Sequence, residues 1–164
     1  ERGTNGFFFA MQNSSKSLMT PTEFDEFSLE YDLEVLKAMK GSDLLLLHIC
    51  TKRQTDEFYA DKISRYPVHA INWWDRGSPM DLRKARDKYG NRFCLVGGLD
   101  QERTLPKGNV DQVESEARQA IECAGNGFML GPGCTIPLNS PEKNLQAAIR
   151  VAHANSRLSS RITR

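Results

Sequence analysis

Two side chains that commonly bind metals stand at the end of a strongly apolar run. The run is "DLLLLHIC" (residues 43–50), and it ends with His48 and Cys50. If the run is a β-strand, its side chains alternate between two faces, so that His48 and Cys50 point to the same side. An imidazole and a thiol on one side can bind a metal, but a buried strand also accommodates both as packed side chains. The spacing leaves both interpretations open.

A third residue of this kind is Cys134, in the segment "GPGCTIP" (131–137). One histidine and two cysteines suit zinc, and three protein ligands leave the fourth position open for a reactant. Because His-x-Cys followed by a distant cysteine arises easily by chance, the alternative is a buried histidine with two buried thiols. The other two cysteines, Cys94 and Cys123, lie in an apolar run and near a helix end, where we expect simple packing.

Five short apolar runs alternate with helical patterns along the chain. Each run is continuously apolar, which is typical of strands in a parallel sheet that is covered on both faces. The runs lie at residues 6–10, 44–50, 68–74, 93–98 and 127–133. They indicate repeated βα units of an α/β fold, either an open doubly wound sheet or part of a (βα)8 TIM barrel. Because no glycine-rich nucleotide-binding fingerprint is present, we favour the barrel, with about five βα units in a single partial-barrel domain over residues 1–164.

The first helical pattern covers residues 20–40. It begins with a capping box and a proline, in "TPTE". Five apolar side chains then recur at spacings of three and four residues, which predicts a single buried helix face. They are Phe24, Phe27, Tyr31, Val35 and Met39.

Polar residues cluster directly after the predicted strands. In both architectures the carboxyl ends of the strands form the edge where ligands bind. Four of these residues are predicted substrate contacts, with tight turns or packing as their alternative roles. They are Gln12, Asn72, Asp75 and Asp100.

The composition excludes several classes of protein. The chain has 164 residues with 22 basic and 21 acidic side chains, so it has no basic footprint for nucleic acid or an anionic membrane. No run approaches the roughly 18 apolar residues of a membrane span, and no signal-peptide pattern opens the chain. The four cysteines lack the dense spacing of a secreted disulfide framework. We therefore predict a cytoplasmic protein with reduced thiols that binds neither nucleic acid nor membrane.

Several segments resemble the C-terminal part of the uroporphyrinogen decarboxylase superfamily. They are "LLLLHIC", "INWWDR", "LVGGLDQ" and "GFMLGPGCTIPLNSPEKNLQAAIRVA". The resemblance extends from about Gly6 to Ala154 and implies a (βα)8 barrel of which this chain holds the fourth to eighth units. Because the chain begins with Glu1 and runs almost directly into a strand, we expect the natural protein to continue upstream.

The superfamily holds two chemistries. Uroporphyrinogen decarboxylases work without a metal and carry a Gly-His-Gly near the final strand, where this chain has Pro132 between two glycines. The other branch resembles methylcobalamin:coenzyme M methyltransferase and binds zinc through a His-x-Cys and a later cysteine. The match to this branch implies that His48, Cys50 and Cys134 hold Zn²⁺. It also implies that Asn72, Asp75 and Asp100 contact either these ligands or the substrate. Thr51 departs from the glycine usual in the branch, so the loop at residues 52–58 is expected to shape the substrate site.

The resemblance implies an enzyme that moves a methyl group from a corrinoid, such as methylcobalamin, to a small-molecule thiol. A separate corrinoid protein is then a candidate partner. One alternative is decarboxylation of a tetrapyrrole in porphyrin biosynthesis, and another is a partial barrel without activity of its own. A partial barrel leaves two strand edges without neighbours, which predicts self-association.

Overall fold

Five parallel strands form one sheet in the order β1-β2-β3-β4-β5. The computed structural model describes residues 3–51 and 56–162, with side chains described up to residue 155. The strands are β1 (Gly6–Met11), β2 (Leu44–Ile49), β3 (Ala70–Trp73), β4 (Cys94–Leu99) and β5 (Phe128–Pro132). This arrangement confirms the α/β class, because helices alternate with parallel strands throughout.

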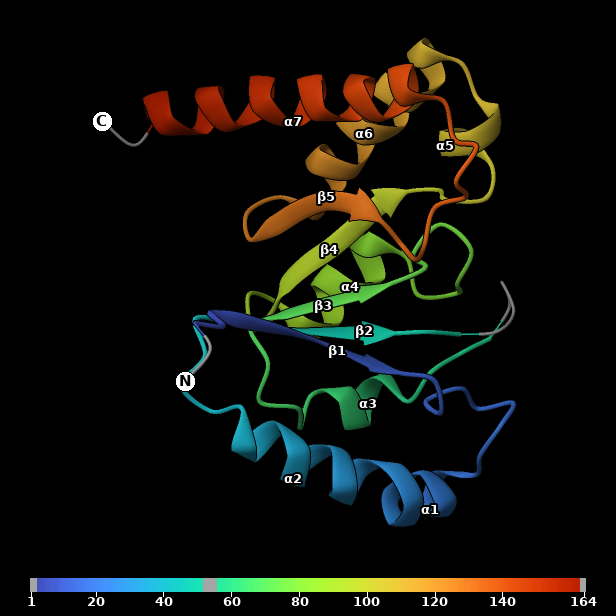
Figure 1. Cartoon of the computed structure of the whole chain (residues 1–164), viewed down its shortest axis with the longest axis vertical. Coiled ribbons are helices and arrows are strands. Elements are labelled where there is room, and N and C mark those ends of the chain that lie inside the picture. The colour runs from blue at the N-terminus through green and yellow to red at the C-terminus, as the bar shows by residue number, and fades with distance from the viewer. Residues whose placement is uncertain (1–2, 52–55, 163–164) are drawn as a thin grey trace.

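The helices follow the sheet around one side, from α1 and α2 beside β1 to α6 and α7 beside β5 (Figure 1). They are α1 (Pro21–Phe24), the π-helical turn η1 (Asp25–Leu29), α2 (Glu30–Ala38), α3 (Ala60–Ile63), α4 (Leu82–Tyr89), α5 (Thr104–Lys107), α6 (Val110–Ala124) and α7 (Glu142–Ile162). In the described residues, no helix has the length and apolar character needed to cross a membrane.

Strand β2 shows how the sheet separates its two faces. Leu45, Leu47 and Ile49 belong to the main hydrophobic core, which the helices cover. The alternate residues Leu46 and His48 line a cavity on the inner face. Successive side chains of a strand point to opposite faces. Because Leu45, Leu47 and Ile49 are packed in the core, Leu46 and His48 must point to the inner face.

The first helical segment begins as predicted but buries a different face. Thr20 forms the capping box with Glu23. However, three of the predicted core residues are exposed, with relative accessibilities of 58% for Phe27, 63% for Tyr31 and 44% for Val35. The buried side chains are instead Phe24, Ser28, Leu29 and Leu36.

The π-helical turn explains this difference. The N–H of Glu30 bonds to the carbonyl of Asp25, five residues earlier, so the turn holds one residue more than an α-helical turn. Phe24 and Leu29, which are five residues apart, therefore face the core together. A sequence pattern counted at 3.6 residues per turn misses this change of phase.

Close packing between β4 and α6 requires a glycine at position 98. Gly98 has φ +97°, and a Cβ there would lie 2.4 Å from the Cβ of Ala120. On α6, Val113, Ala117 and Ala120 are buried. The small side chains of α6 and Gly98 together bring this helix close to the strand.

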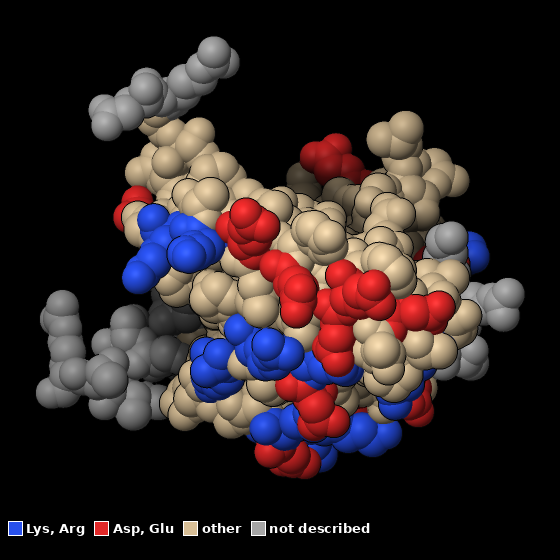
Figure 2. Space-filling model, turned by 90° about the horizontal axis from the view of Figure 1, so that it is seen from below, with Lys and Arg blue, Asp and Glu red and all other residues tan. Residues whose placement is uncertain are grey.

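The sequence predicted that every strand is covered on both faces, and this prediction is wrong for the two outer strands, β1 and β5. Phe8 of β1 is 64% exposed and Met129 of β5 is 47% exposed, whereas β3 is buried throughout. In the described residues β1 and β5 each pair with only one strand, so one edge of each strand has no neighbour to cover it. On the face seen from below, acidic and basic side chains are interspersed (Figure 2).

Candidate metal centre

His48 lies on β2 and points to the inner face of the sheet. Its side chain is 6% exposed. The adjacent Leu47 and Ile49 fill the core on the opposite, helix-covered face. Cys50 follows two residues later, and its side chain lines the same cavity as the His48 imidazole. The alternation predicted for this strand is therefore confirmed.

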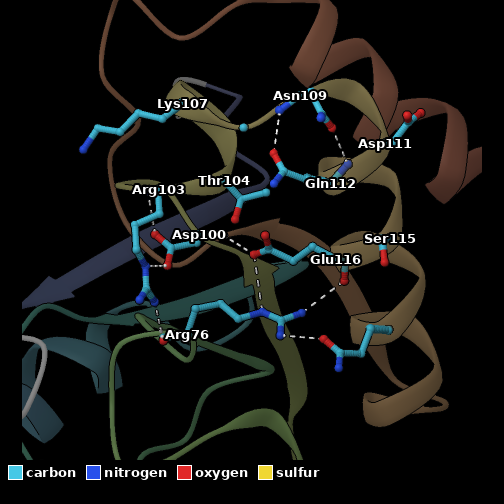
Figure 3. A pocket seen from close by; sticks show the side chains of 12 residues that line it. Arg76, Asp100, Arg103, Thr104, Lys107, Asn109, Asp111, Gln112, Ser115 and Glu116 are labelled. Atoms are coloured by element: carbon cyan, nitrogen blue, oxygen red, sulfur yellow. Dashed lines mark hydrogen bonds and ion pairs between the residues drawn. The ribbon is translucent and has the colours of Figure 1, made fainter.

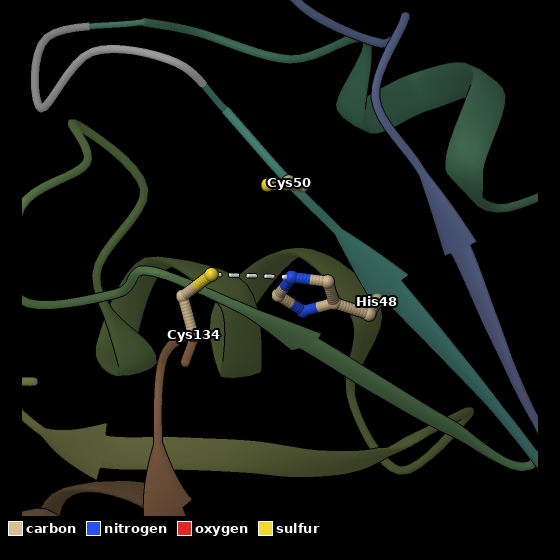
Figure 4. A group of neighbouring side chains, drawn as sticks. All are labelled: His48, Cys50 and Cys134. Atoms are coloured by element: carbon tan, nitrogen blue, oxygen red, sulfur yellow. Dashed lines mark hydrogen bonds between the residues drawn. The ribbon is translucent and has the colours of Figure 1, made fainter. Parts of the chain in front are cut away.

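Cys134 reaches the same cavity from the loop between β5 and α7 (Figure 4). Its Sγ atom lies 3.6 Å from Nε2 of His48. The ligand atoms of His48, Cys50 and Cys134 all lie within 4.8 Å of one another. Gly133 permits this approach, because a Cβ at that position would lie 2.6 Å from the Cα of Trp74. The fold thus brings together the three residues that the sequence pattern singled out.

The His/Cys cluster (His48, Cys50 and Cys134) lines a cavity of about 510 Å³. Phe8 packs its ring against the His48 imidazole, with ring centroids 5.4 Å apart and an interplanar angle of 26°. Apart from the cluster, the lining is mostly apolar, with Gln12, Asn72 and Thr135 as polar members. It consists of Phe8, Ala10, Gln12, Leu46, Asn72, Val96, Pro132 and Thr135. The cluster therefore faces a space with room for a small molecule and largely apolar walls.

Burial shifts the pKa values of His48 and Cys50. Desolvation lowers the pKa of His48 below its ordinary value, although the hydrogen bond with Asn72 opposes this shift. Desolvation raises the pKa of the Cys50 thiol, and the neighbouring Cys134 adds to the effect. At neutral pH the imidazole is therefore uncharged and the Cys50 thiol keeps its proton. A cation that binds here must displace that proton.

The donor set and its spacing fit a zinc ion. In tetrahedral zinc sites, a Zn–N distance of about 2.0 Å and a Zn–S distance of about 2.3 Å place the nitrogen and sulfur about 3.5 Å apart. The distance between His48 Nε2 and Cys134 Sγ is 3.6 Å. Cys50 supplies a third donor, which leaves one coordination position open.

The four predicted substrate contacts separate into two groups. Gln12 and Asn72 line the cavity beside the His/Cys cluster, whereas Asp75 lies outside it. Asp75 is buried, and its Oδ1 accepts a hydrogen bond of 2.9 Å from the N–H of Gly98. Burial raises the pKa of Asp75 to about 6, against the opposing effects of Gly98 and Arg76. Substrate contact by these residues stays a prediction.

Asp100 lies in a different, polar pocket of about 910 Å³ between α5 and α6 (Figure 3). Its carboxylate accepts hydrogen bonds from the N–H of Glu102 at 2.9 Å and of Arg103 at 3.0 Å, and from Nε of Arg103 at 2.6 Å. Glu116 accepts from the Asp100 N–H at 2.7 Å and lies 3.5 Å from Nε of Arg76. The opposite charges of this network balance one another. The hydrogen bond between Asp100 and Glu116 connects the loop after β4 to α6.

The apolar lining was not singled out from the sequence, although a usable signal was present. Counting back by two from His48 gives Leu46, and counting back from Gln12 gives Ala10 and Phe8. All of these residues line the cavity. Of the loop predicted to shape the substrate site, residues 52–55 lie outside the described residues.

A comparison with known protein families identifies the chain. The family model described as uroporphyrinogen decarboxylase (URO-D) matches residues 6–155, which include all three residues of the cluster. The chain belongs to the uroporphyrinogen decarboxylase family. This membership confirms the resemblance seen in the sequence.

Within the uroporphyrinogen decarboxylase family, the curated relatives include two kinds of enzyme. The methylcobamide:CoM methyltransferase MtbA of Methanosarcina acetivorans is 27% identical, over 93% of this chain and 42% of its own length. The methylcobamide:CoM methyltransferase MtaA of Methanosarcina barkeri is 28% identical, over 91% of this chain and 41% of its own length. A uroporphyrinogen decarboxylase of Sulfurimonas denitrificans is 24% identical, over 88% of this chain and 40% of its own length.

A solved structure confirms the fold. A methyltransferase from Methanosarcina mazei superimposes with a TM-score of 0.77 at 25% sequence identity, and the match covers 94% of this chain and 43% of that chain. The five βα units thus have the fold of part of a TIM-barrel methyltransferase. The chain spans about two-fifths of the length of the curated relatives that it matches.

Proposed function

We propose that this chain supplies the zinc site of a methyltransferase that moves a methyl group from a corrinoid to a thiol. The observation that carries the proposal is the His/Cys cluster, whose ligand atoms lie within 4.8 Å of one another in a cavity. Similarity to two methylcobamide:CoM methyltransferases supports it. Because the chain spans about two-fifths of these relatives, the activity is proposed for the whole protein.

In this proposal His48, Cys50 and Cys134 hold the metal. Zinc bound there would lower the pKa of a substrate thiol and so supply a nucleophile at neutral pH. The apolar side chains of Phe8 and Leu46 line the cavity beside these donors and would offer little competing solvation to a bound methyl group. A corrinoid, free or carried by a partner protein, is the proposed methyl donor.

Decarboxylation of a tetrapyrrole is the second candidate function. Similarity to uroporphyrinogen decarboxylases, at 24% identity, supports it. Pro132 argues against it, because proline offers no ionisable group where the decarboxylase pattern has histidine. Turnover of a porphyrinogen by the whole protein would favour this candidate, whereas thiol-dependent demethylation of methylcobalamin would favour the first.

Zinc content tests the proposal directly. We expect elemental analysis of the purified chain to find about one zinc ion per chain, as for a site with three protein ligands. Substitution of one donor leaves two, which hold zinc weakly, so His48→Ala, Cys50→Ser and Cys134→Ser should each reduce the zinc content to background.

Matched controls are Cys94→Ser and Cys123→Ser, which remove thiols outside the cluster and should keep the zinc. Full zinc content in the three cluster variants would contradict the metal assignment. Absence of zinc from the unsubstituted chain, loaded with zinc and then desalted, would contradict it as well.

A further inference from the structure

The carboxamide of Asn72 is held in one orientation by two neighbouring strands. Asn72 lies on β3 and is 5% exposed. Its Nδ2 donates hydrogen bonds to the carbonyl of Val96 on β4 at 2.9 Å and to the carbonyl of Pro132 on β5 at 3.0 Å. Carbonyl oxygens only accept, so the opposite orientation would set the amide oxygen against two acceptors. The NH₂ group is therefore fixed toward β4 and β5, and Oδ1 toward β2.

This orientation determines which nitrogen of His48 carries the proton. Oδ1 of Asn72 lies 2.6 Å from Nδ1 of His48. An amide oxygen has no hydrogen to donate, so Nδ1 must be the donor in this bond. In the neutral ring Nε2 then keeps its lone pair, and Nε2 is the nitrogen 3.6 Å from Cys134 Sγ. The lone pair thus points toward the two cysteines.

A second histidine, directly before the neighbouring strand β3, has the opposite arrangement. Nδ1 of His69 accepts a hydrogen bond of 2.9 Å from the backbone N–H of Leu45. Nδ1 of His69 therefore carries no proton, and its neutral ring is protonated at Nε2. His48 lies on β2 and His69 directly precedes β3. Their rings have different partners, so the tautomer of each follows from its own hydrogen bond.

We propose that Asn72 is a positioning residue, which fixes the tautomer and the ring orientation of His48 so that Nε2 is presented as the metal ligand. All the polar hydrogens of its carboxamide are used in bonds to the protein, which favours contact with a metal ligand over contact with the substrate. The metal part of this inference rests on the proposed function. Partners of this kind typically change metal affinity by about 10–100-fold when they are removed.

The tautomer is tested in the metal-free chain by ¹⁵N-NMR of the imidazoles at pH 8. We expect the Nδ1–H form for His48 and the Nε2–H form for His69, with signals assigned through His48→Gln and His69→Gln. In Asn72→Ala, the His48 signals should move toward a mixture of tautomers while those of His69 stay unchanged. An unchanged Nδ1–H tautomer of His48 in this variant would overturn the proposal.

Zinc affinity, measured by competition with a chromophoric chelator, gives the second readout. Asn72→Ala should bind zinc about 10–100-fold more weakly than the unsubstituted chain. Asn144→Ala is the matched control, because Asn144 is fully buried and its Nδ2 also donates to two carbonyls, those of Leu105 and Gly108. This variant should lose stability without losing zinc affinity. Equal affinity losses in both variants would show a general effect of destabilisation and would overturn the positioning role.

A third variant guards against failure of Asn72→Ala to fold. Asn72→Asp keeps an acceptor for the Nδ1–H of His48, so it should retain the tautomer and bind zinc more tightly than Asn72→Ala, even if it is less stable. Loss of the tautomer in a folded Asn72→Asp chain would count against the proposal. If the unsubstituted chain binds no zinc, the proposed function fails, while the tautomer measurements still decide the role of Asn72.

Discussion

At the scale of single residues, the sequence identified the donors of the cluster but not their partners. Strand alternation was enough to place His48 and Cys50 on one side. The bond between His48 and Asn72 could not be predicted, because it depends on the register that pairs these two residues across β2 and β3. The bond between Asp100 and Arg103 could not be predicted from its position after a strand either, and substrate contact by Asp100 stays a prediction.

Asp75 gives the chain a predictable dependence of stability on pH. Its folded pKa of about 6 lies above the ordinary value of 3.8, so the folded state binds this proton more tightly than the unfolded state. The contribution of Asp75 to stability is therefore most favourable below pH 4 and is lost as the pH rises through about 6. Asp75→Asn keeps an oxygen that can accept from Gly98 but does not ionise.

Relative to the unsubstituted chain, the free energy of unfolding of Asp75→Asn should rise by up to about 3 kcal/mol between pH 4 and pH 7. Urea denaturation of both proteins across this range measures the difference. A difference that stays constant with pH would show that burial of Asp75 does not shift its titration.

At the scale of secondary structure, helix ends were more predictable than helix faces. The capping box of Thr20 and Glu23 is local, and the structure confirms it. The buried face depends on the number of residues per turn, which the π-helical turn η1 changes after Phe24. Tertiary packing selects such a turn, so a regular spacing of apolar residues could not reveal it.

Two phenylalanines of this segment test the corrected face. Phe24 is fully buried, whereas Phe27 is 58% exposed. We expect Phe24→Ala to lower the free energy of unfolding by about 3–5 kcal/mol, the usual cost of a large core cavity. Phe27→Ala should cost about 1 kcal/mol or less, because its side chain leaves little new cavity. Chemical denaturation of the two variants gives both values, and similar losses would contradict the assignment of faces.

At the scale of the whole molecule, the order of βα units was predictable because each strand and helix has a local pattern. The two open strand edges were predicted from the partial barrel. The exposed faces of β1 and β5 were not, because their apolar runs resemble those of the buried inner strands. Each outer strand has an edge that no described strand covers. Apolar edges of this kind pair readily with other chains.

We therefore expect the chain to self-associate, with an apparent mass in light scattering that rises with protein concentration. Met129→Lys places a charge on the exposed strand β5 and should reduce the association. Leu138→Lys is the matched control, since Leu138 is fully exposed but lies in the loop after β5. A monomer at every concentration would rule out association through the sheet edges.

The distance along the chain between the candidate metal ligands has a consequence for biosynthesis. His48 and Cys134 are 86 positions apart, and β3, β4 and β5 are made between them. A ribosome that adds about 5–20 residues per second needs roughly 4–17 seconds to supply that interval. Until then His48 and Cys50 offer two ligands, which hold any ion weakly. Under the proposed function the chain therefore completes its metal site only after the last strand has joined the sheet and has brought Cys134 to the other two donors.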